Sequence, residues 1–158
     1  MTLNETQDEI IEDFELFDDW MDKYNWLIEL GNQLEPLNPK HKNNEYLIEG
    51  CHSKVWLHAE LDNGKINFTA DSDAIITKGI VALLVKVMSG RKPEEIKDAD
   101  LYFIDRIGLK ENLSPTRSNG LLAMIKQMKL YGLAYYAKRR EEGNRGGKGN
   151  KGEEESKK

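Results

Sequence analysis

The stretch VWLHAELDNGKINFTADSDAIITKGIVALLVKVMSG, residues 55–90, decides the architecture of this chain. Its first half alternates apolar and polar residues on both sides of the turn sequence DNG at 62–64, a pattern that predicts a β-hairpin. Its second half is apolar on most sides of a helical projection, which predicts a buried central helix. We expect that helix to be capped by Ser72 or Asp73 and to end at Gly90.

Helices are also expected on the N-terminal side of this segment. Apolar residues recur at steps of three and four within residues 10–28, which is the spacing of an amphipathic helix. Thr2 and Glu5 have the spacing of a capping box, and the sequence FDD at 17–19 divides the region into two helices. The segment 31–46 contains two prolines and four asparagines, so it is expected to be a loop.

The C-terminal part of the chain is expected to be helical as well. A short helix begins at Pro93, with Glu94 and Glu95 in its first turn, and a further element covers 100–109. The last helix starts within LSPTRSNG, residues 113–120. Its apolar stripe comprises Leu121, Leu122, Met124, Ile125, Met128, Tyr131 and Tyr135.

Residues 139–158 differ in composition from the rest. They contain five glycines, charges of both signs and no apolar side chain, so they cannot bury surface to offset their chain entropy. We therefore expect one folded domain over residues 1–138, followed by a disordered, charged, Gly-rich tail. Residues 46–49, YLIE, are β-prone and are expected to add a third strand to the hairpin. The predicted fold class is α+β, with a small three-stranded antiparallel sheet packed against several helices.

The composition argues against some classes of function. The chain has 23 Lys and Arg against 28 Asp and Glu, a net charge of −5, whereas binding of nucleic acid requires a basic face. The most apolar run, residues 74–88, contains Lys78 and Lys86 and is shorter than the roughly 20 residues of a membrane span. The N-terminus has neither the basic nor the apolar region of a secretory signal. We therefore expect a cytoplasmic protein that binds neither nucleic acid nor membrane.

The single cysteine, Cys51, lies between the predicted strands. A free cysteine is most often an inert buried side chain. Here, however, Gly50 permits tight backbone geometry and close approach by a partner, while His52 and Ser53 are polar neighbours unsuited to a core. With one cysteine no disulfide forms within the chain, so the thiol is free to react in a reducing compartment.

The residues around Cys51 do not complete a recognisable catalytic or metal site. A cysteine hydrolase needs a histidine held by a third group, and none of His41, His52 and His58 lies in such a motif. Zinc sites and iron–sulfur clusters usually take about four ligands, whereas this chain has one cysteine. No metal site is therefore expected.

Two further motifs contain charged residues. Asp71 and Asp73 in ADSDA resemble part of a calcium loop, but the glycine and distal glutamate of that loop are missing, so helix capping is the better interpretation. Arg117 follows Ser114 and Pro115 at the start of the last helix, where backbone donors can hold an anion. A structural ion pair is an equally good interpretation of Arg117.

Three stretches together resemble the SufE family of sulfur-acceptor proteins: EGCHSKVWL at 49–57, FTADSDAIITKGIVALL at 68–84 and LSPTRSNGLLAM at 113–124. The similarity covers about residues 8–138, and the motifs GC-x-S-x-VW, ADSDA and SP-x-RSNG occur in the order and spacing of that family. The resemblance implies a SufE/IscU-like α+β fold. It also implies that the cysteine lies at a loop tip, with its thiol shielded in an apolar pocket until a partner docks.

For function, the resemblance implies that Cys51 accepts sulfane sulfur, as a persulfide, from a pyridoxal-phosphate cysteine desulfurase of the SufS or CsdA type. The chain is then expected to stimulate that enzyme and to relay the sulfur toward an iron–sulfur cluster scaffold, without being an enzyme itself. No cofactor is expected, because the pyridoxal phosphate belongs to the partner. The alternative is a scaffold-like protein for iron–sulfur clusters, since the family fold is shared with such proteins.

The same resemblance implies roles for residues around the cysteine. Asp73 and Arg117 are expected near the Cys51 loop, and Arg117 is a candidate for contacting the partner or anchoring that loop. His52 is a departure, because glutamine is common at this position in the family. Residues 139–158 lie outside the family pattern, so the resemblance implies nothing about them.

Overall fold

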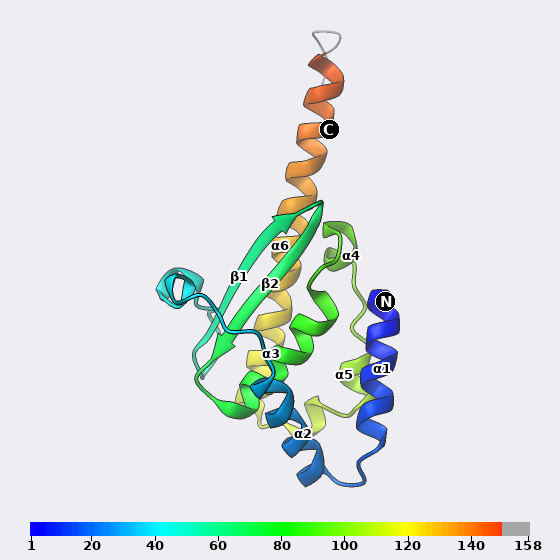
Figure 1. The fold of residues 1–158 in the computed structure, drawn as a ribbon, viewed down its shortest axis with the longest axis vertical. Helices are drawn as coiled ribbons and strands as arrows, with labels where there is room; N and C mark the ends of the chain where they lie inside the picture. The colour runs from blue at the N-terminus through cyan, green and yellow to red at the C-terminus, as the bar shows by residue number, and fades with distance from the viewer. Residues whose placement is uncertain (150–158) are drawn as a thin grey trace.

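A computed structural model describes residues 1–149 of the chain. Helix α3, Ile75–Met88, lies at its centre, and Figure 1 shows this helix between a β-hairpin and helix α1. Helices α2 and α6 complete the layer around it. The arrangement is an α+β fold in one domain, because a helix that is apolar on most sides is stable only when other elements cover it.

The hairpin has the predicted form. Strands β1, Val55–Asp62, and β2, Lys65–Ser72, pair antiparallel with Val55 opposite Ser72 and Asp62 opposite Lys65. The turn uses left-handed backbone at Asn63 (φ 55°) and Gly64 (φ 78°), the conformation that tight hairpin turns require. One face of the hairpin is buried against the helices. Its buried apolar residues are Val55, Leu57, Ile66, Phe68 and Ala70.

The expected third strand is wrong for the described residues, in which the sheet has two strands. Leu47 forms a single bridge with Trp56, and the Ile48 amide donates to the Val55 carbonyl over 2.9 Å. The chain then turns away at Gly50, whose φ of +92° strongly favours glycine. The segment before Gly50 therefore forms one bridge to β1 and does not extend into a third strand.

Helix α3 begins without the expected cap. Its N-cap residue is Ala74, which supplies no capping side chain. Strand β2 continues through Ser72, whose hydroxyl donates to the Lys54 carbonyl and accepts from the Ala74 amide, while the Asp73 carboxylate accepts from the Lys54 amide. Neither side chain accepts from an amide within α3, so the predicted capping role is wrong.

The N-terminal region forms two helices, as predicted. Helix α1, Leu3–Glu15, has the capping box, with the Glu5 amide donating to Thr2 Oγ1 over 3.0 Å. Helix α2, Trp20–Asn32, is capped by Asp19. The loop that follows contains two short 3₁₀ helices, η1 at Pro39–His41 and η2 at Asn44–Tyr46.

The C-terminal elements are α4, Pro93–Lys97; α5, Phe103–Arg106; the 3₁₀ helix η3, Lys110–Asn112; and α6, Pro115–Gly149. Of these, α4 and α6 start where predicted, whereas the element expected over 100–109 is a helix of four residues that starts at Phe103. Of the expected apolar stripe on α6, Leu121, Met124 and Met128 are buried, whereas Leu122 is exposed. Only part of the predicted stripe is therefore buried in the core.

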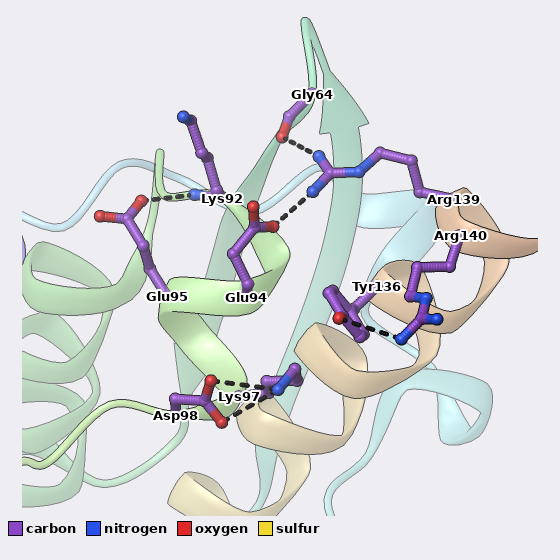
Figure 2. Close-up of polar contacts among 9 residues, drawn as sticks. All are labelled: Gly64, Lys92, Glu94, Glu95, Lys97, Asp98, Tyr136, Arg139 and Arg140. Atoms are coloured by element: carbon purple, nitrogen blue, oxygen red, sulfur yellow. Dashed lines mark hydrogen bonds and ion pairs between the residues drawn. The ribbon is translucent and has the colours of Figure 1, made fainter. Parts of the chain in front are cut away.

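Helix α6 continues beyond residue 138, where the disordered tail was expected to start. Figure 2 shows why: Arg139 donates to the Gly64 carbonyl at the hairpin tip over 3.3 Å and pairs with Glu94 of α4. Lys97 of α4 lies over the ring of Tyr136, 4.6 Å from its centroid. These contacts give polar residues a packing role that composition alone does not reveal. Residues 150–158 of the expected tail lie outside the described part.

The crossing of α2 and α3 yields a stability prediction. A Cβ atom at Gly79 of α3 would overlap the Leu27 carbonyl oxygen of α2 and lie 2.7 Å from its carbonyl carbon. Because both backbones are fixed by helical hydrogen bonds, we expect Gly79→Ala to lower the free energy of unfolding by about 2 kcal/mol or more. Urea denaturation followed by circular dichroism measures this.

The matched control is Gly143→Ala in α6, where a Cβ atom meets nothing within 4 Å. Alanine is the better helix former, so this change is expected to be neutral or to stabilise by up to about 1 kcal/mol. Equal effects of the two substitutions would contradict the close packing of α3 on α2.

Candidate functional site

Cys51 lies on the connection that leads into β1, and this connection is held at both ends. At its start, Gly50 packs so closely on α6 that a Cβ atom there would lie 3.3 Å from the Ala123 side chain. At its end, the Lys54 amide donates to Asp73 Oδ1 over 3.0 Å, and the Lys54 carbonyl accepts from the Ser72 hydroxyl over 2.9 Å. The residues between these anchors, 51–53, form the tip of the loop.

The thiol of Cys51 is half-buried and packs on α6. It donates to the Gly120 carbonyl, with 3.6 Å between Sγ and the oxygen. A Cβ atom at Gly120 would lie 3.7 Å from Sγ, so glycine at this position lets the loop lie directly on the helix. Burial raises the pKa of the Cys51 thiol, because the charged thiolate loses hydration. The resting side chain is therefore a protonated thiol at neutral pH.

Beside the thiol is a cavity of about 410 Å³ where the loop, α3 and α6 meet. The loop contributes Cys51, His52 and Ser53 to it. Helix α3 and the start of α6 supply the rest of the lining, namely Thr77, Ile80, Ser114, Thr116, Arg117, Gly120 and Met124. The pocket expected from the resemblance was apolar, whereas the lining of this one includes the polar residues Ser114, Thr116 and Arg117.

The structure thus brings together four of the six residues expected at the site: Cys51, His52, Ser53 and Arg117. Gly50 and Asp73 do not line the cavity. They act at the two ends of the loop, Gly50 through its positive φ and Asp73 through its bond to the Lys54 amide.

Sequence reasoning did not assign the other six lining residues to the site, and two of these, Thr77 and Gly120, could have been found. Thr77 lies within the apolar run of α3, one helical turn from Ile80, so the helical period could have placed it beside the site. Gly120 lies in the SPTRSNG stretch, and a glycine early in a helix is a signal of close backbone approach.

Arg117 occupies the first turn of α6. Its backbone amide donates to Ser114 Oγ over 3.3 Å, which caps the helix. Its side chain is exposed, and across residues 1–149 it has no ion pair or hydrogen bond. The interpretation of Arg117 as a structural ion-pair residue is therefore wrong for this structure.

The other motifs lie apart from the cavity wall. Asp71 pairs with Lys42 at 2.8 Å and Lys78 at 3.4 Å, so it is held by cations of the chain and neither caps α3 nor belongs to a calcium loop. His41 and His58 stack on each other with ring centroids 3.6 Å apart, and neither lines the cavity.

In the part of the chain that the structure describes, no group of three or more His, Cys, Asp and Glu side chains lies close enough together to hold a metal ion. None of the helices found there is both long and apolar enough to cross a membrane.

The buried thiol yields a pH prediction. Because the thiolate is the nucleophile, we expect the rate of alkylation of Cys51 by iodoacetamide to rise with pH around a midpoint above that of the same cysteine in the urea-unfolded chain. The raised native pKa stabilises the fold below the unfolded pKa, and this contribution is lost as pH rises through the native one.

Alkylation is measured by intact mass over a pH series, with Cys51→Ser as the control that takes up no label. A native midpoint at or below the unfolded one would contradict the burial of the thiol.

Comparison with known proteins places this geometry in a family. Residues 8–131 match the family model SufE, described as an Fe-S metabolism associated domain. An uncharacterized SufE-like protein of Rhizobium etli is 42% identical over 127 residues, which cover 77% of this chain and 86% of that protein. A second such protein, from Rhizobium meliloti, is 39% identical over 127 residues, with coverages of 77% and 91%.

A plant protein is similar in sequence, and a solved structure is similar in fold. An Arabidopsis thaliana protein named SufE-like protein 1, chloroplastic/mitochondrial, is 40% identical over 139 residues, 87% of this chain and 38% of the plant protein. The solution structure of a hypothetical protein from Thermus thermophilus has a similar fold, with a TM-score of 0.69 at 20% identity over 84% of this chain and 96% of that one. The family model and the relatives together show that this chain belongs to the SufE family.

Proposed function

We propose that this chain is a sulfur acceptor that takes sulfane sulfur onto Cys51 from a cysteine desulfurase, stimulates that enzyme and passes the sulfur to an iron–sulfur cluster scaffold. Membership of a family associated with Fe-S metabolism supports the general role. The observation that carries the proposal is the position of Cys51, the one cysteine of the chain, at the tip of an anchored loop beside a cavity.

The chemistry requires one thiol on this chain. The Cys51 thiolate attacks the outer sulfur of the donor's persulfide, the bond between the two donor sulfurs breaks, and the donor cysteine leaves as a thiolate, as in thiol–disulfide exchange. Cys51 then carries the persulfide, and no resolving cysteine is needed to hold it. A free thiol of this kind suits a reducing compartment such as the cytoplasm.

The resting thiol must change its environment before it reacts. It is protonated by burial and donates to the Gly120 carbonyl, and a thiol in this state is a poor nucleophile. A donor of the SufS or CsdA type that binds the loop tip better in an exposed position would shift the loop toward that position. The anchors at Gly50 and Lys54 confine the movement to residues 51–53.

Arg117 is the charged residue best placed to assist this step. Arg117 lines the cavity that Cys51 shares and has no ion pair among the described residues, and a cation brought near a thiol lowers the thiol pKa. His52 lines the same cavity and occupies the neighbouring position on the loop tip. Since a scaffold would need about four ligands for a cluster and this chain has one cysteine, the carrier role fits the chain better than the scaffold alternative.

The sulfur-acceptor role has a measurable effect on a desulfurase. Addition of the wild-type chain to a SufS- or CsdA-type enzyme with free cysteine is expected to raise the rate of alanine formation several-fold, because removal of the persulfide frees the enzyme for the next turnover. Cys51→Ala is expected to bind the enzyme, to give no stimulation, and to reduce stimulation when mixed with the wild type.

Asp62→Asn, at the opposite end of β1 from the loop, serves as the control and is expected to stimulate as the wild type does. Equal stimulation by Cys51→Ala and the wild type would refute a role for the thiol.

A further inference from the structure

The cavity beside Cys51 is larger than a single added sulfur atom requires. Its volume is about 410 Å³, whereas an apolar cavity of about 150 Å³ is enough to admit a benzene molecule. A persulfide adds one atom to the Cys51 side chain. The remaining space has the size of a small organic molecule such as an amino acid.

The wall of this cavity has the chemistry of an anion site. Its lining includes Arg117 and the hydroxyl-bearing residues Ser114 and Thr116, and no Asp or Glu of the described residues lines it. The cavity lining therefore carries a positive charge, although the chain as a whole has a net charge of −5. A guanidinium group presents paired donors that match the two oxygens of a carboxylate.

The wall also contains the start of α6, a helix of 35 residues. The first turn of a helix presents backbone amides without helical partners and the positive end of the helix dipole. Ser114 satisfies one of these amides, that of Arg117. Pro115 has no N–H, and the Ser118 amide donates to the Ser114 carbonyl over 2.9 Å. The amide of Thr116 is therefore the free backbone donor of this turn, and with the helix dipole it favours a negative charge.

An independent observation comes from α3, on the other side of the cavity. Thr77 is 6% exposed and lines the cavity, yet its hydroxyl has no hydrogen-bond partner among the residues that the structure describes. The Thr77 hydroxyl is not among the fully buried polar atoms that lack a partner, so it is accessible although the residue as a whole is buried. A ligand in the cavity that Thr77 lines can therefore form a hydrogen bond with it.

We propose that the cavity binds the carboxylate of a small thiol of amino-acid size, held by Arg117 and Thr77, and that this thiol takes the sulfur from Cys51. The inference rests on the proposed function, because Cys51 must first carry a sulfur. It adds a second acceptor for the sulfur carried by Cys51, namely a free anionic thiol that receives the sulfur directly, without a protein scaffold.

The transfer balances without an oxidant or reductant. The thiolate of the small molecule attacks the outer sulfur of the Cys51 persulfide, forming a new S–S bond, while the bond between that sulfur and Cys51 Sγ breaks. Cys51 leaves as a thiolate and takes up the proton that the incoming thiol released. The products are the persulfide of the small thiol and the free thiol of Cys51.

The test uses the full chain, loaded at Cys51 with inorganic polysulfide to one added sulfur atom, as confirmed by intact mass. The acceptors are mercaptopropionate, mercaptoethanol and cysteamine, in which the same two-carbon thiol ends in a carboxylate, a hydroxyl or an ammonium group. The rate of sulfur loss is measured by intact mass against acceptor concentration and expressed per thiolate. Loading without a desulfurase separates this test from that of the proposed function.

We expect the rate to saturate with mercaptopropionate and to stay linear with the other two acceptors. Arg117→Gln is expected to raise the half-saturating concentration about tenfold, as for loss of a charge-assisted bond. Thr77→Val is expected to raise it about threefold, without loss of stability because an unpartnered hydroxyl is replaced by a methyl group of the same size. Arg140→Gln, which removes an arginine far along α6, is the control for net charge.

Linear dependence on all three acceptors would overturn the proposal. So would an unchanged half-saturating concentration in Arg117→Gln, or an equal rise in Arg140→Gln, since either result would show that the carboxylate is not held in this cavity.

Discussion

The structure depends on the burial of α3, a helix that is apolar around most of its circumference. Such a helix must be covered on every side, and its cover is assembled from α1, α2, α6 and the hairpin. Gly79 makes this possible on the α2 side, because any side chain there would overlap the α2 backbone. The site follows from the same requirement: where α6 and the entry to β1 meet over α3, the Cys51 loop lies against Gly120 and Thr77 faces a cavity.

Much of this fold could be predicted from the sequence, because strong local signals agreed with tertiary packing. The DNG turn, the alternating strands and the apolar run of α3 needed no information from distant residues. Two of the errors arose where a distant residue took part. Ser72 and Asp73 bond to Lys54 and do not cap α3, and Arg139 bonds to Gly64 and Glu94, which continues a helix through residues whose composition suggests disorder.

The candidate site, likewise, could be predicted from the sequence only in part. The nucleophile could be picked from the sequence because it is the only cysteine, and its family motif covers the loop and the start of α6. The polar wall of the cavity could not, since Thr77 sits in an apolar helix and its unpartnered hydroxyl is visible only once the elements are placed together. A protonated thiol on a short anchored loop, with an unpaired arginine lining the same cavity, fits a carrier whose reactivity depends on its partner.

The central claim is that Cys51 itself carries the sulfur. The most direct measurement is the intact mass of the wild-type chain and of Cys51→Ser after incubation with an active cysteine desulfurase and free cysteine, in the absence of reductant. We predict a gain of one sulfur atom on the wild type, located on the peptide that contains Cys51, and no gain on the variant. No gain on the wild type with persulfidated enzymes of both the SufS and CsdA types, or an equal gain on Cys51→Ser, would contradict this claim.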